Sequence, residues 1–111
     1  MKISVLGAGT WGVALARVLA LAGHQVTVWS AVEKEIDILS ETHIHPNLPG
    51  MVLPDTITLT KDLAAACTGT ELLLFAVPSV YVRSVAAQVR PLIPDGLVIA
   101  DVAKGIEPDT L

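Results

Sequence analysis

A glycine-rich turn near the amino terminus constrains the fold of this chain more than any other feature. The apolar run 3–6 leads directly into Gly7-x-Gly9-x-x-Gly12, and a helical pattern over 10–22 follows. In a strand–turn–helix unit the first glycine permits a tight turn, the second lets the backbone approach a pyrophosphate, and the third lets helix and strand pack closely. The free N–H groups at the helix start also favour phosphate. A turn that needs glycine for its backbone alone accounts for one of the three. The sequence therefore predicts a dinucleotide-binding turn.

Strand-like and helical segments alternate along the rest of the chain. The strands are almost continuously apolar, which is typical of a parallel sheet that is covered on both faces. This pattern predicts an α/β fold, a Rossmann-type doubly wound parallel sheet in the strand order 3-2-1-4-5, with the ligand at the carboxyl ends of the strands. We expect strands at 3–6, 25–29, 56–60, 72–77 and 97–102, helices at 10–22, 32–41, 61–67 and 79–89, and a long irregular loop at 42–54. The apolar face of the first helix is expected to consist of Trp11, Ala14, Leu15, Val18 and Leu19.

The composition narrows the classes of partner and the compartment. The 111 residues suffice for one domain, 1–111, and the net charge of −4 comes without a basic run, so nucleic acid is not an expected partner. No apolar run approaches the roughly 20 residues that cross a bilayer, so no membrane span is expected. Cys67 is the only cysteine, which suits a reducing, cytoplasmic location and a place in the core. His43 and His45 lack a third ligand, so we expect surface residues and no metal site.

The variable positions of the turn and the end of the second strand bear on the choice of cofactor. Thr10 offers a backbone N–H and a hydroxyl to a phosphate, whereas Trp11 either lies along the cofactor or covers the sheet. Enzymes that use NAD usually place a carboxylate after the second strand, where it holds the ribose hydroxyls. This chain has Ser30 there, no acid before Glu33, which is already in the helix, and no arginine for the extra phosphate of NADP. The pattern leans slightly towards NADPH, with one hydrogen bond from Ser30.

Two further residues follow strands at the expected ligand edge. Pro78 ends the fourth strand, where it is either a wall beneath the nicotinamide or an ordinary strand stop. Lys104 follows the fifth strand. From its position alone it is either a solvated surface lysine or a cation that binds a substrate phosphate or polarises a carbonyl.

Taken in order, several segments resemble the bacterial type of NAD(P)-dependent glycerol-3-phosphate dehydrogenase. The specific parts are the glycine turn with threonine and tryptophan at its variable positions and the ending Ala103-Lys104-Gly105-Ile106-Glu107. The resemblance covers nearly the whole chain. The other similar segments are Val13-Ala14-Leu15-Ala16, Val28-Trp29-Ser30, Leu48-Pro49, Leu63 to Cys67 and Ala76-Val77-Pro78-Ser79.

The resemblance implies an oxidoreductase that transfers a hydride between NAD(P)H and dihydroxyacetone phosphate, giving sn-glycerol 3-phosphate for phospholipid synthesis. It also implies that Thr10 and Trp11 contact the cofactor and that Lys104 contacts both cofactor and substrate. In this family a second, helical domain supplies the general-base lysine and most of the substrate phosphate pocket. We therefore expect no catalytic residue within 1–111 and little or no turnover by this chain alone. The expected cofactor-binding residues are Gly7, Gly9, Thr10, Trp11, Gly12, Ser30, Pro78 and Lys104.

Two segments depart from the family pattern. Ser30-Ala31 stand where the family often has arginine or histidine, which weakens the case for NADPH. Asn47-Leu48-Pro49 stand where it usually has Tyr-Leu-Pro, so an aromatic contact is lost.

Two alternatives remain open. One is another dehydrogenase of the same build, of the 6-phosphogluconate or 3-hydroxyacid type, against which the ending 104–107 argues. The other is a non-catalytic module that senses NAD(H). We also expect the reading frame to continue past Leu111, because Pro108 with its acidic neighbours looks like the start of another helix. Exposed apolar surface on an isolated unit of this kind makes a homodimer an expected assembly.

Overall fold

Five parallel strands form one sheet in the order β3-β2-β1-β4-β5 in the computed structural model, which describes residues 1–45, 50, 52–77, 79–93 and 96–101. The predicted strand order and the Rossmann-type fold are confirmed. The strands are β1 (Lys2–Leu6), β2 (Gln25–Trp29), β3 (Thr58–Thr60), β4 (Leu72–Phe75) and β5 (Val98–Asp101). The helices are α1 (Thr10–Leu21), α2 (Glu33–Thr42), α3 (Leu63–Cys67), α4 (Ser79–Val89) and the short 3-10 helix η1 (Arg90–Leu92).

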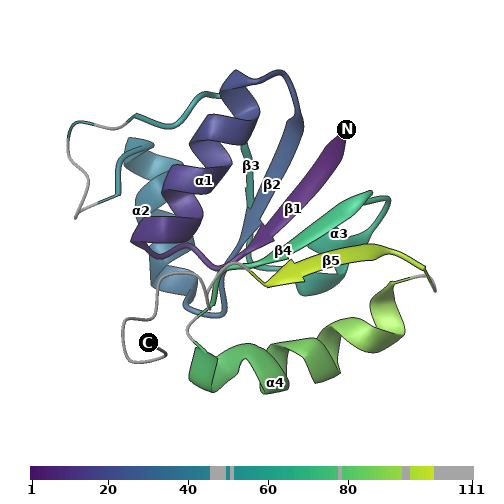
Figure 1. The fold of residues 1–111 in the computed structure, drawn as a ribbon. Coiled ribbons are helices and arrows are strands. Elements are labelled where there is room, and N and C mark those ends of the chain that lie inside the picture. The colour runs from purple at the N-terminus through teal and green to yellow at the C-terminus, as the bar shows by residue number, and fades with distance from the viewer. Residues whose placement is uncertain (46–49, 51, 78, 94–95, 102–111) are drawn as a thin grey trace, which may run out of the picture.

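Helices cover both faces of the sheet, α1 and α2 on one face and α3 and α4 on the other (Figure 1). Successive residues of a strand point to opposite faces, so each strand contributes to two cores. In β1, Ile3 and Val5 pack towards α1 and α2, whereas Leu6 packs towards α3 and α4. The first core is completed chiefly by Val13, Ala16, Val26, Val28, Ile36, Leu39, Leu53 and Leu74, and the second by Trp29, Ala66, Cys67, Leu73, Phe75, Val77, Val85 and Val89.

Helix α1 buries a stripe that only partly matches the predicted one, since Leu15 and Leu19 pack against the first core as predicted. Its buried residues are Gly12, Val13 and Ala16, while Trp11 is 43 % exposed and Val18 is 61 % exposed. The rotation of the helix is set by Gly12, which must face the sheet at the point of closest approach. This orientation turns Trp11 and Val18 towards solvent, although their spacing fits an apolar face.

The segment after α2 is more ordered at its ends than the predicted irregular loop. His43 ends α2 with a φ of 58°, in the left-handed region, and its carbonyl accepts a 2.8 Å hydrogen bond from the Leu53 N–H. Ile44 and Val52 form an isolated antiparallel bridge. The two ends of this segment therefore lie side by side, and Leu53 is buried in the first core.

Other boundaries differ from the predictions by a few residues. The third strand begins at Thr58, because the Ile57 N–H donates a 3.1 Å hydrogen bond to the Pro54 carbonyl and closes a turn before it. Helix α2 begins at Glu33, with Val32 extended as its N-cap. The 3-10 turn η1, which has a proline near its start, was not predicted.

Candidate functional site

The candidate site lies where the strands β1, β2 and β4 end level with one another. Leu6 is in register with Trp29 on one side and with Phe75 on the other. The turn after β1 is tied to both neighbours, since the Gly7 N–H donates to the Trp29 carbonyl at 2.6 Å and the Ala76 N–H donates to the Leu6 carbonyl at 2.9 Å. Helices α1, α2 and α4 all begin at this edge (Figure 1). The switch point of the doubly wound sheet therefore holds the glycine turn.

Gly7 has a backbone that requires glycine. Its φ is 129°, which side-chain-bearing residues rarely adopt. A Cβ atom there would also lie 2.7 Å from the backbone carbon and oxygen of Ala76. Both observations agree with the predicted tight turn between β1 and α1.

Gly12 provides the close approach of α1 to the sheet. A Cβ atom at this position would collide with the Gly7 carbonyl oxygen and lie 3.2 Å from the Ala76 Cβ. The helix can lie this close to the turn and to the end of β4 only because position 12 has no side chain.

Gly9 differs from both, because a side chain there would not disturb the fold. It is the N-cap of α1, with φ −73° and ψ −178°, and an added Cβ would meet none of the described residues within 4 Å. No side chain in the described part of the chain caps this helix, and its first turn has no acidic residue. Gly9 thus leaves open space beside the uncapped N–H groups of α1. This is the cradle that a pyrophosphate requires, and the residues present fit a dinucleotide.

Thr10 and Trp11 are both exposed in the first turn of α1. Trp11 therefore does not cover the sheet, which was one of its two predicted roles. Its ring is accessible beside the cradle, at the start of the helix.

The end of β2 holds a hydrogen-bonded pair that the sequence did not predict. The Ser30 hydroxyl donates to Glu35 Oε1 at 2.6 Å and accepts from the Val32 N–H at 3.0 Å. Ser30 is only 4 % exposed, so its predicted hydrogen bond to a cofactor competes with one already made. Although no acid precedes Glu33 in the sequence, Glu35 reaches back to this strand end from the third position of α2. Glutamate at this helical position often reaches back past the helix start, which is the signal that could have identified it.

Several predicted site residues lie outside the described residues. These include Pro78 and Lys104, as well as Asn47-Leu48-Pro49, and their roles stay predictions.

The histidines and the cysteine differ in how far they are buried in the fold. His43 is half-buried, with Nδ1 3.7 Å from Asp55 Oδ1, but His45 is only 7 % exposed, so its predicted place at the surface was wrong. Cys67 is buried, as predicted, and burial raises the pKa of its thiol.

Within the described ranges, no three histidine, cysteine or acidic residues are grouped to hold a metal ion, and no helix is long and apolar enough to cross a membrane.

Comparisons with known proteins agree with the geometry of the site. Residues 2–111 match the family model described as the N-terminus of NAD-dependent glycerol-3-phosphate dehydrogenase. A Lactobacillus delbrueckii glycerol-3-phosphate dehydrogenase [NAD(P)+] is 63 % identical over 110 residues, and one from Agathobacter rectalis is 48 % identical over 111, in each case covering 99 % of this chain and 33 % of the relative. The chain thus spans about a third of the length of the curated relatives it matches.

Solved structures of dehydrogenases also resemble this chain. Glycerol-3-phosphate dehydrogenase from Coxiella burnetii superposes with a TM-score of 0.85 at 35 % identity, over 90 % of this chain and 31 % of that one. A 3-hydroxyisobutyrate dehydrogenase from Mycobacterium tuberculosis, at 16 % identity and a TM-score of 0.69 over 90 % of this chain and 30 % of that one, shares the fold alone.

Proposed function

Because this chain belongs to the NAD-dependent glycerol-3-phosphate dehydrogenase family, matching its N-terminal part, we propose that it holds NAD(P)(H) for the reduction of dihydroxyacetone phosphate to sn-glycerol 3-phosphate and its reverse. The observation that carries this proposal is the open space at Gly9, beside the uncapped start of α1. At the flanking positions Gly7 and Gly12, by contrast, an added side chain would collide with the turn or with Ala76.

Each residue of the turn has a distinct part in this proposal. Gly7 and Gly12 shape the cradle, and the absence of a side chain at Gly9 lets the pyrophosphate reach the N–H groups of α1. Thr10 adds a donor at the helix start, and the exposed ring of Trp11 lies along the cofactor.

The reacting end of the site is proposed to lie across the carboxyl ends of β4 and β5. The chemistry that a bound reduced nicotinamide supplies is hydride transfer to the ketone carbon of the substrate. We place Pro78 beneath the nicotinamide and Lys104 against both cofactor and substrate, where its ammonium group suits a phosphate or a developing alkoxide.

The domain arrangement and the assembly are part of the same proposal. Residues 1–111 form the NAD(P)-binding domain, and a helical domain outside them carries the general-base lysine that handles the proton. We propose a cytoplasmic location, which the lone reduced cysteine suits. We also propose a homodimer, because the edge strand β5 exposes Val98 and Ile99.

A chimera tests the function. This chain would replace the matching N-terminal third of the Lactobacillus delbrueckii relative, and oxidation of NADH or NADPH would be followed after adding dihydroxyacetone phosphate. We expect the chimera to turn over, the 111-residue chain alone to bind the cofactor without turnover, and dihydroxyacetone without its phosphate to be a poor substrate. A folded chimera that binds the cofactor but does not reduce dihydroxyacetone phosphate would contradict the proposed substrate. Full activity of the chain alone would contradict a general base outside it.

A further inference from the structure

The pair formed by Ser30 and Glu35 stands beside the glycine turn. The Gly7 N–H is bonded to the carbonyl of Trp29, the residue immediately before Ser30. Leu6 and Trp29 are also in register, so the residues that follow β1 and β2 leave the sheet at the same level. The Glu35 carboxylate is thereby held at the end of β2, the same strand end to which the glycine turn is bonded.

The hydrogen bonds of the pair orient its charge. The one hydroxyl proton of Ser30 is committed to Glu35 Oε1, and the Val32 N–H donates to the Ser30 oxygen in turn. Among the described residues Glu35 Oε1 has this one partner, and a carboxylate can accept about four hydrogen bonds. Glu35 is only partly buried, so the group retains accepting capacity towards a ligand.

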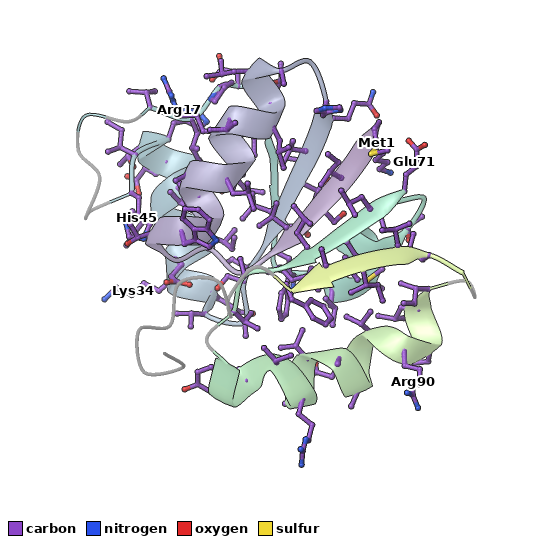
Figure 2. All side chains as sticks on the ribbon, in the orientation of Figure 1. Met1, Arg17, Lys34, His45, Glu71 and Arg90 are labelled. Atoms are coloured by element: carbon purple, nitrogen blue, oxygen red, sulfur yellow. The ribbon has the colours of Figure 1, made fainter. Side chains whose placement is uncertain are left out.

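No cation within the described ranges neutralises this carboxylate. Lys61 is paired with Asp37 at 2.6 Å, and Arg17 donates to the Val52 carbonyl. Lys34 adjoins Glu35 in sequence, but it is exposed and extends outward from α2 (Figure 2). The end of β2 is therefore a hydrogen-bond acceptor with a negative charge.

We propose that Glu35, held by Ser30, accepts a hydrogen bond from the adenosine ribose 2′-hydroxyl and makes this chain select NAD(H) over NADP(H). The inference rests on the proposed function, because it assumes that the pyrophosphate lies on the glycine turn. A carboxylate at the end of the second strand binds the ribose diol and repels a 2′-phosphate. The proposal reverses the slight lean towards NADPH, because that lean was based on the absence of an acid at the end of the second strand.

The test is a calorimetric titration of the chain with NADH and with NADPH, in the wild type and in two variants. Glu35→Gln removes the charge that contacts Ser30. Glu33→Gln is the matched control, since it removes the same charge from the same first turn of α2, and Ser30 is hydrogen-bonded to Glu35 rather than to Glu33. Thermal unfolding of all three proteins checks that the fold is retained.

The wild type is expected to bind NADH at least about tenfold more tightly than NADPH, a difference that one charge-assisted contact provides. Glu35→Gln should weaken NADH binding, strengthen NADPH binding and bring the ratio of dissociation constants near one, while Glu33→Gln leaves the ratio within about twofold of the wild type. Equal binding of both dinucleotides by the wild type, or an equal change in both variants, would overturn the role of Glu35 and leave the proposed function standing. Failure of both dinucleotides to bind would overturn the proposed function itself.

Discussion

The Gly7 N–H donates a 2.6 Å hydrogen bond to the Trp29 carbonyl and so joins the glycine turn to the end of β2. This bond brings together two elements of the proposed cofactor site, the cradle at the start of α1 and the Ser30–Glu35 pair at the start of α2. Substitutions in the two elements can therefore be compared by their effects on the stability of the fold and on dinucleotide binding.

Gly12→Ala should destabilise the fold. The added methyl group would collide with the Gly7 carbonyl oxygen and lie 3.2 Å from the Ala76 Cβ, so α1 has to shift. Overpacking of this kind costs about 1–3 kcal/mol, measured by urea unfolding. Gly50→Ala is the control, because a Cβ there would meet no atom of the described residues within 4 Å. Equal stability of the two variants would contradict the close approach of α1.

Ser30→Ala should loosen Glu35 without removing it. The substitution leaves the Val32 N–H without its side-chain acceptor and costs about 1 kcal/mol of stability. Its distinguishing effect is on selectivity: the preference for NADH should fall several-fold, with NADPH binding unchanged or improved. Ser40→Ala, at an exposed position of α2, should change neither quantity. A purely structural role for Ser30 would lower stability and leave the NADH-to-NADPH ratio unchanged.

The two tryptophans should separate binding from stability. Trp11 is 43 % exposed, so Trp11→Ala should weaken dinucleotide binding and change the unfolding free energy by at most about 0.5 kcal/mol. Trp29 is buried and its Nε1–H donates to the Lys61 carbonyl at 3.0 Å, so Trp29→Ala should cost about 3–5 kcal/mol. Calorimetric binding and urea unfolding measure the two effects. Loss of stability in Trp11→Ala would show that the ring packs on the fold.

Cys67 should be unreactive in the folded chain. It lies at the end of α3 in the second core, and burial raises the pKa of its thiol above the ordinary value, which lowers the thiolate fraction at pH 8. A thiol reagent such as Ellman's reagent should therefore label the native protein far more slowly than the denatured one. Because Cys67 is the chain's one cysteine, the signal is unambiguous. Rapid labelling of the native protein would contradict its burial.

The sequence predicted the framework of the site well, because that framework depends on local rules. The glycine spacing at 7, 9 and 12 and the alternation of apolar segments both indicate strand–turn–helix units in a parallel sheet, and the predicted strand order is the one observed. The rotation of α1 was predicted only in part, because apolar spacing allowed a face with Trp11, whereas the contact of Gly12 with the turn decides the rotation. Glu35 and the burial of His45 were missed because each depends on how a segment folds back, which periodicity does not encode.

The most direct test of the dinucleotide cradle is to titrate wild-type chain and Gly9→Val with NADH and NADPH, with thermal unfolding measured in parallel. Position 9 has ordinary backbone angles and open space, so the valine should be accommodated, with a change of at most about 1 kcal/mol in stability. Its side chain would occupy the space assigned to the pyrophosphate. The account predicts that Gly9→Val unfolds like the wild type and loses at least about a hundredfold in affinity for both dinucleotides. A folded Gly9→Val protein that binds either of them as tightly as the wild type would contradict it.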